Sequence, residues 1–122
     1  MFQPHLKRLV EGTDGGVAGL LMGFDGIAVE SYASPDAQGP AQDVNTLGME
    51  FSFILTQVRK AAEILEIGGV HEVTVRCEKL TLLFRVVSKD YFVALAIRAE
   101  GNFGKGRYLL RLVTPQIQAE VA

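Results

Sequence analysis

The chain contains few residues whose types and spacing could do chemistry. It has two histidines, His5 and His71, and a single cysteine, Cys77. His71 and Cys77 fall on the same face of one predicted strand, but six strand residues separate them by roughly 20 Å. They cannot share an ion, because zinc ligands lie only about 2 Å from the metal, so the sequence predicts no metal site. No motif sets a base beside Cys77, which we expect to be a buried core residue rather than a nucleophile.

A glycine-rich stretch near the end of the chain, GNFGKGR at residues 101–107, has the composition of a phosphate-binding loop that opens a helix. No Ser or Thr follows Lys105, however, and the spacing of the glycines is not that of a P-loop. We interpret the stretch as a flexible connection between a strand and a helix. Two carboxylate pairs are expected on solvated faces: Glu63 with Glu66, and Glu72 with Glu78. With no catalytic constellation, no metal site and no cofactor motif, the sequence predicts a protein that is not an enzyme.

The overall charge and composition argue against several classes of partner. The formal net charge is −2, whereas phosphate binding needs a clear basic excess, so we expect no nucleic-acid partner. No window approaches the roughly 20 apolar residues that cross a bilayer, and we expect no membrane insertion. One cysteine cannot form an internal disulfide, which favours a cytoplasmic location. Residues 1–122 are long enough to form a single domain with its own core.

The hydrophobic patterns predict elements in the order α-β-β-α-β-β-β-α. The stretch MGFDGIAVES at residues 22–31 indicates a hairpin, because the pair Asp25-Gly26 accepts the positive φ angles of a tight turn. A long helix is expected from Asp43, which can cap its start, to Ile67. The other expected elements are a helix over 2–11, strands over 17–24, 27–32, 70–77, 80–87 and 91–98, and a final helix that begins near Lys105 and is kinked or ended by Pro115.

The pattern of burial orders the strands. The strands over 17–24 and 91–98 are apolar on both alternating faces, which is typical of central strands that are covered on both sides. The strand after the hairpin is half polar, and the strand over 70–77 alternates strictly, with Val73, Val75 and Cys77 inward, so both belong at edges. Tight turns between neighbouring strands make the sheet mostly antiparallel. The sequence thus predicts an α+β fold, with a five-stranded sheet in the order 2-1-5-4-3 between helices.

The long helix has more apolar surface than the sheet requires. The stripe predicted to cover the sheet consists of Val44, Leu47, Phe51, Leu55, Val58, Ala62 and Leu65. Further apolar residues align on the opposite side of the helix, beside the open edge strand. Scattered surface residues are one interpretation, but an aligned group favours an interface. The predicted dimer or partner interface consists of Met49, Phe53, Gln57, Lys60 and Ile64 on the helix and Glu72, Thr74 and Arg76 on the strand.

With this order of elements, the chain resembles the roadblock/dynein-light-chain family, and in particular its bacterial MglB-like branch. The resemblance covers nearly the whole chain. It is carried by the hairpin GLLMGFDGIAVES, the segment NTLGMEFSFILTQVRKAAEILEIGGVHEVTVR and the ending GNFGKGRYLLRLVTP. None of these stretches is a catalytic signature, so the specificity comes from their order and spacing together. The resemblance implies a roadblock/profilin-like fold.

The resemblance also implies a function. It implies a homodimer, built from the long helix and the third strand into one continuous sheet, that binds a small Ras-like GTPase of the MglA type. Bacterial relatives stimulate GTP hydrolysis by reshaping the GTPase's own site without an arginine finger, and no motif assigns this activity to particular residues. The alternative is a non-catalytic scaffold subunit, dynein-light-chain-like or in a signalling complex, with no effect on GTP turnover. Because the final helix looks short, contacts made by a longer C-terminal extension in some relatives are expected to be missing.

Overall fold

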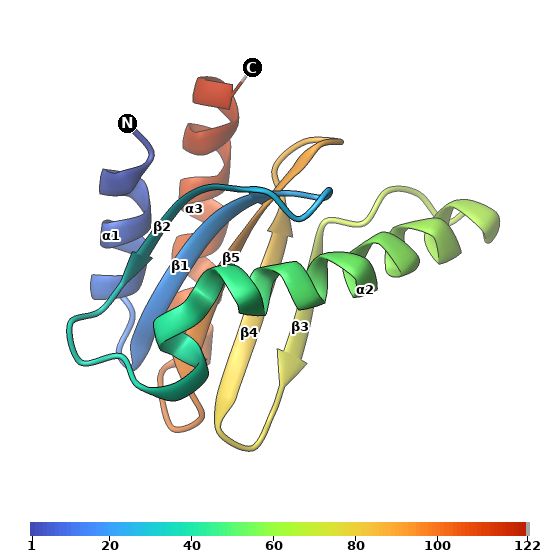
Figure 1. Cartoon of the computed structure of the whole chain (residues 1–122). Coiled ribbons are helices and arrows are strands. Elements are labelled where there is room, and N and C mark those ends of the chain that lie inside the picture. Colours follow the sequence, from blue (N-terminus) through green and yellow to red (C-terminus); the bar gives the residue numbers. More distant parts are fainter. Residues whose placement is uncertain (122) are drawn as a thin grey trace.

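The computed structural model describes residues 1–121 and contains one sheet with helices on both faces. Figure 1 shows α1 and α3 together on one face and α2 crossing the other. In chain order the elements are α1 (Gln3–Glu11), β1 (Gly16–Gly23), β2 (Ala28–Ala33), a short 3-10 helix η1 (Gly39–Asp43), α2 (Val44–Ile64), β3 (Glu72–Arg76), β4 (Leu80–Val86), β5 (Tyr91–Arg98) and α3 (Phe103–Val121). The predicted order of helices and strands is confirmed.

The sheet has the predicted strand order, β2-β1-β5-β4-β3, and every neighbouring pair is antiparallel. β1 and β5 lie in the middle of the sheet, and their interior residues are buried, as their two-sided apolar patterns require. β2 and β3 form the two edges. The predicted α+β fold class is therefore confirmed.

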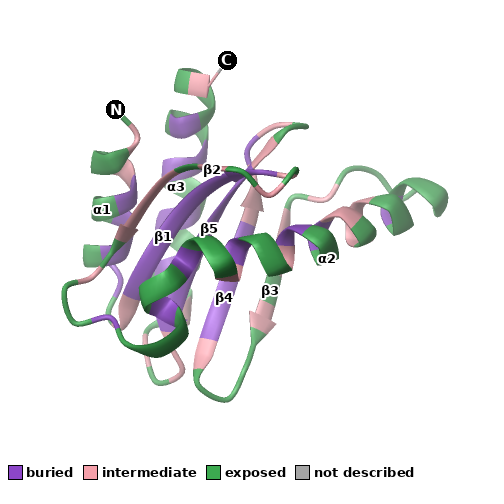
Figure 2. Cartoon of the chain, viewed as in Figure 1, coloured by how far each residue is buried: buried purple, intermediate pink, exposed green. Residues whose placement is uncertain are grey.

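Each face of the sheet carries its own hydrophobic core. In Figure 2 the central strands β1 and β5 are coloured as buried along most of their length. Leu21 and Leu95 belong to the core beneath α1 and α3, whereas Leu20 belongs to the core beneath α2. At Gly48, α2 approaches β1 so closely that a Cβ would lie 2.2 Å from the Leu20 Cδ2 atom. This close packing accounts for a glycine in the helix interior, where it costs roughly 1 kcal/mol relative to alanine.

The β1–β2 hairpin forms where predicted, with one difference in its geometry. Gly26 has a positive φ of +86°, but Asp25 does not. Gly26 N donates to Gly23 O, and Gly23 N donates to Ile27 O. The Asp25 side chain accepts a hydrogen bond from Ile27 N at 3.0 Å, which is how aspartate commonly stabilises a turn.

The long helix begins as predicted and ends earlier. Asp43 caps α2, since its Oδ1 atom accepts a hydrogen bond from Thr46 N at 3.2 Å. The helix ends at Ile64 rather than Ile67. Glu66 adopts a left-handed conformation with φ +55°, and Ile67 N donates back to Ala62 O. These bonds satisfy the last helix carbonyls in the manner of a Schellman motif, so the chain leaves the helix before Gly68.

The final helix is longer than predicted. α3 begins at Phe103, where the Asn102 Oδ1 atom caps Lys105 N at 2.9 Å, and it runs through Pro115 to Val121. Of the two effects predicted for Pro115, a kink or an end of the helix, the end is wrong, and the expectation of a short helix is also wrong. The proline removes the hydrogen bond to the carbonyl of Arg111, and both residues lie on the exposed side of α3, where water can satisfy that carbonyl.

Cys77 is exposed, so the prediction that it is a buried core residue is wrong. β3 ends at Arg76, and Cys77 N donates to Leu80 O as the chain turns into β4. The side chain is in phase with Val73 and Val75, both of which pack against the core beneath α2. At Cys77, however, that face of the sheet opens into a groove instead of lying under the helix.

Candidate interaction surface on α2 and β3

α2 presents three faces. The sheet face contains its buried residues Val44, Gly48, Ser52, Leu55 and Ala62. The outer face, opposite the sheet, contains the residues predicted from the sequence: Met49, Phe53, Gln57, Lys60 and Ile64. All five are exposed, and Phe53 has 71% of its surface accessible. The structure therefore brings the predicted helix residues together on one side, while their role in binding stays a prediction.

The third face of α2 was missed in the sequence. It consists of Leu47, Phe51, Ile54, Val58, Ala61 and Leu65, which we call the seam. These residues recur at alternating steps of four and three, the spacing of apolar residues in helices that pair with another helix. None is fully buried, and Ile54 and Leu65 are 49% and 67% exposed. The stripe predicted to cover the sheet includes Leu47, Phe51, Val58 and Leu65. Of these, Leu47 and Phe51 do pack with one side against the core beneath α2.

An apolar groove continues the seam toward the sheet. The groove has a volume of about 380 Å³ and lies between the N-terminal half of α2 and the β3–β4 turn. Leu47 and Phe51 line it from the helix, Leu80 and Leu82 line it from β4, and Cys77 lies at the turn. The apolar surface left open here is therefore contributed by two elements far apart in the sequence.

The opposite flank of α2 is anchored to the sheet. Arg59 Nη1 donates to Lys89 O in the β4–β5 turn at 3.0 Å, and its guanidinium lies 3.9 Å from the centre of the Phe24 ring. Gly26 in the β1–β2 turn faces Met49 and Ser52. These contacts cover that flank, whereas the seam on the other flank is only partly covered and the outer face is exposed.

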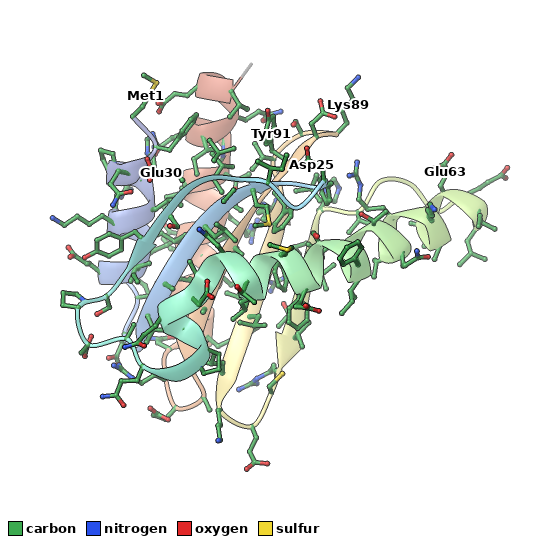
Figure 3. All side chains as sticks on the ribbon, viewed as in Figure 1. Met1, Asp25, Glu30, Glu63, Lys89 and Tyr91 are labelled. Atoms are coloured by element: carbon green, nitrogen blue, oxygen red, sulfur yellow. The ribbon has the colours of Figure 1, made fainter. Side chains whose placement is uncertain are left out.

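The C-terminal end of α2 projects past the edge of the sheet. Figure 1 shows the helix extending beyond β3, and Figure 3 shows the Glu63 side chain on this projecting end. Residues 63–69 are all exposed, and they include the apolar side chains of Ile64, Leu65 and Ile67. A helix end with three exposed apolar residues and no strand beneath it lacks part of the packing that an amphipathic helix needs.

β3 has an open edge. It pairs with β4 on one side only, with Glu72 opposite Arg85 and Arg76 opposite Thr81. His71 O accepts from Val86 N, and Cys77 N donates to Leu80 O. Backbone groups alternate in direction along an antiparallel strand, so the N–H and C=O groups of Glu72, Thr74 and Arg76 point away from β4. The edge thus offers a row of free hydrogen-bonding groups to another strand.

Charged side chains surround this edge on the face that carries α3. Glu72 Oε1 accepts a hydrogen bond from Arg107 Nε at 2.7 Å, and Glu72 Oε2 accepts one from Arg85 Nη1 at 3.1 Å. The hydrogen bonds from Arg107, followed by its charge and that of Arg85, hold the pKa of Glu72 below its ordinary value against the effect of burial. The Arg76 guanidinium lies 5.1 Å from the centre of the Phe103 ring. The predicted strand residues Glu72, Thr74 and Arg76 therefore share the face of the sheet that carries α3.

The glycine-rich stretch at residues 101–107 is a packed connection. A Cβ at Gly106 would lie 2.6 Å from Ile97 Cδ1, and a Cβ at Gly101 would lie 2.5 Å from Ile97 Cγ2. The glycines therefore allow the start of α3 to approach β5 closely. Over residues 1–121, no group of three or more His, Cys, Asp or Glu residues could hold a metal ion. In the same residues, no helix has the length and apolar character needed to cross a membrane.

Comparison with solved structures identifies the family. The chain superimposes on a roadblock/LC7 domain from Streptomyces avermitilis with a TM-score of 0.82 and 14% identity, covering 96% of this chain and 94% of that one. The corresponding values for MglB from Thermus thermophilus are 0.84 and 17%, covering 98% and 89%. MglC from Myxococcus xanthus is 44% identical, with a TM-score of 0.71 and 98% of both chains covered. The chain belongs to the roadblock/LC7 family.

This assignment confirms the resemblance inferred from the sequence, since MglB and MglC proteins are both among the structural neighbours of this roadblock chain. No family model and no curated protein matches it. The alignment with MglC includes α2 and β3, because it covers 98% of the chain.

Proposed function

We propose that this roadblock protein is a homodimeric regulatory adaptor that binds a small Ras-like GTPase and does no bond-making chemistry of its own. One observation carries the proposal: α2 and β3 leave an apolar seam, a projecting helix end and an open strand edge side by side. A second copy of the chain can cover all three. The domain of residues 1–122 is proposed to act as one unit in this dimer.

The dimer contact follows from the geometry of these features. If β3 pairs with β3 of a second copy about a two-fold axis, the two sheets join into one. The projecting end of α2 then lies over the partner's sheet, where Leu65 and Ile67 can enter the groove beside the partner's α2. The two α2 helices run antiparallel, and their seams face each other at the spacing typical of paired helices. The exposed apolar surface is then buried on both copies.

The outer face of α2 remains free in such a dimer. Phe53, Gln57, Lys60 and Ile64 are exposed on this face, and Met49 is exposed at its border with the β1–β2 turn. The two-fold axis presents this face twice. A broad surface with exposed aromatic and aliphatic side chains and polar neighbours suits a protein partner. We propose that a small Ras-like GTPase of the MglA type binds here, and that the dimer stimulates GTP hydrolysis by holding the GTPase's own catalytic groups in place.

A scaffold role is the second candidate, and one observation favours it. The chain is 44% identical to MglC but 17% identical to the Thermus MglB. The sequence identity with MglB is therefore too low to indicate that this chain shares the properties particular to MglB. In this reading the dimer holds other proteins together and leaves GTP turnover unchanged.

The test uses a purified MglA-type GTPase from the same organism. A regulator can shift a switch protein only by binding its two states differently, so the dimer should bind the GTPase loaded with a non-hydrolysable GTP analogue at least about tenfold more tightly than the GDP form. It should also raise the rate of GTP hydrolysis. A Met49→Ser/Phe53→Ser variant should lose both effects while remaining a dimer. Equal affinity for both nucleotide states, or no binding, with unchanged turnover would contradict GTPase regulation and favour the scaffold.

A further inference from the structure

A second groove, with a volume of about 540 Å³, lies between α3 and the connection from α2 to β3. Three arginines and a histidine line it: His71, Arg85, Arg107 and Arg111. Among the described residues that line the groove, Glu72 is the one acidic residue. The groove therefore has a local excess of positive charge, although the whole chain has a formal net charge of −2. Such a concave cationic surface attracts a negatively charged ligand.

Glu72 shows how this groove holds a carboxylate. Its Oε1 atom accepts a hydrogen bond from Arg107 Nε at 2.7 Å, and its Oε2 atom accepts one from Arg85 Nη1 at 3.1 Å. Planar guanidinium groups bind carboxylates through directed, charge-assisted hydrogen bonds. The geometry for binding a carboxylate is thus already present, with a side chain of the same protein as its occupant.

Arg111 is the arginine of the groove that Glu72 does not use. It lies one helical turn after Arg107 on α3, and it makes no ion pair within residues 1–121. No acidic residue lies three or four positions from it along the helix. Like charges four residues apart on a helix repel each other, so a ligand carboxylate between Arg107 and Arg111 would be stabilising. The two arginines therefore offer a position for a second carboxylate.

The surroundings of the arginines suit a peptide better than a small anion. On the other rim of the groove, a Cβ at Gly68 or Gly69 would meet nothing within 4 Å, and the N–H groups of both glycines make no hydrogen bond within residues 1–121. Next to the arginines on α3, Tyr108 and Leu112 are 55% and 41% exposed. A peptide can use the arginines, the free N–H groups and the apolar side chains together, whereas a small anion uses only the arginines and N–H groups.

We propose that this groove binds an acidic segment of a partner protein, with carboxylates of the segment on Arg107 and Arg111 and an apolar side chain against Tyr108 and Leu112. α3 lies on the face of the sheet opposite to α2 (Figure 1). The groove is therefore separate from the outer face of α2 that is proposed for the GTPase, and binding here does not require the homodimer. An adaptor with two such surfaces can hold two proteins at once.

The test measures the binding of a defined acidic peptide. The probe is a fluorescein-labelled peptide of four Asp-Glu-Leu repeats, and the control peptide has four Asn-Gln-Leu repeats. Fluorescence anisotropy at about 50 mM and about 200 mM salt gives the affinities of the full chain for both. The acidic peptide should bind at least about tenfold more tightly than its amide counterpart at low salt, and its affinity should fall as salt screens the charges.

Three variants locate the binding. Arg111→Gln should weaken binding of the acidic peptide by at least about fivefold, because it removes the arginine that has no internal partner. The matched control is Arg8→Gln, which removes the same charge from an exposed position on α1 away from the groove and should leave the affinity unchanged. Glu72→Gln should tighten binding by about threefold or more, because the internal carboxylate no longer competes for Arg85 and Arg107. Circular dichroism checks that each variant is folded.

Several results would overturn the proposal. Equal losses of affinity in Arg111→Gln and Arg8→Gln would show that the overall charge attracts the peptide, and weaker binding by Glu72→Gln would show that the groove does not hold its carboxylates. Absence of binding at low salt would also overturn it. Vesicles containing phosphatidylserine serve as the last comparison, because binding of the vesicles that depends on Arg111, without binding of the peptide, would assign the groove to a membrane surface instead.

Discussion

Glu72 joins three elements through one carboxylate, since it lies on β3 and accepts hydrogen bonds from Arg85 on β4 and Arg107 on α3. The pKa of Glu72 lies below its ordinary value of 4.5, chiefly because of the hydrogen bonds from Arg107. A carboxyl whose pKa is lowered by folding stabilises the folded state above its ordinary pKa. That stabilisation is lost as the pH falls through the lowered value.

The Glu72→Gln variant should therefore have a lower free energy of unfolding than the wild type at pH 7, by about 1 kcal/mol, because Arg107 is half exposed and the pair is screened by water. The difference should shrink as the pH falls from about 4.5 toward 2, where the wild-type carboxyl also becomes neutral. Urea unfolding at pH 7 and at low pH, each at two protein concentrations to separate any dimer contribution, measures it. If the difference in the free energy of unfolding stayed constant with pH, it would contradict a stabilising ion pair between Glu72 and Arg107.

Individual residues were predicted well where the local pattern determined them. The capping role of Asp43 and the inward direction of Val73 and Val75 followed from side-chain chemistry and strand alternation. Cys77 shows the limit of that reasoning. Alternation gives the face toward which a side chain points, but burial also requires something to cover that face. The position of α2 over the sheet, which leaves a groove at Cys77, depends on packing between distant segments.

At the scale of elements, a new negative charge should affect dimerisation differently on the seam and on the outer face of α2. Ile54→Glu sets a carboxylate in the middle of the seam and should weaken self-association by at least about 30-fold, the effect of a contact worth about 2 kcal/mol. Phe53→Glu introduces the same group on the neighbouring residue of the outer face, and we expect the dimer to persist. Sedimentation measures both, with circular dichroism as the check on folding. Dissociation by Phe53→Glu alone would assign the dimer contact to the outer face instead.

The seam overlaps the stripe predicted to cover the sheet, and that prediction is right in part. Leu47 and Phe51 pack against the core beneath α2, whereas Leu65 is 67% exposed. Leu47, Phe51 and Val58 match both the stripe expected to cover a sheet and the narrower spacing of a helix pair. Ile54 distinguishes the two, because it belongs to the helix-pair spacing and not to the stripe. α2 is too long for the sheet beneath it, and this mismatch becomes visible only when the sheet's width is known (Figure 1).

At the scale of the whole molecule, the strand order could be derived because its constraints are few and strong. Two strands apolar on both faces had to be central, and tight turns had to join antiparallel neighbours. The helix ends were harder to predict. The end of α2 depends on Glu66 adopting a left-handed conformation that favours glycine, and the continuation of α3 through Pro115 depends on an exposed carbonyl.

The whole molecule should also unfold as a dimer. When two folded chains share one interface, unfolding releases two separate chains, so stability rises with protein concentration. We expect each tenfold increase in protein concentration to raise the free energy of unfolding of the wild-type dimer by about 1.4 kcal/mol. This increase appears as a higher midpoint of thermal unfolding. Light scattering at micromolar concentration should give twice the 13.3 kDa of one chain. The Ile54→Glu variant is the matched control, and its midpoint should not change with concentration. A wild-type midpoint that is equally independent of concentration, together with a single-chain mass, would show that the seam and the β3 edge stay open in solution and are covered by a different protein.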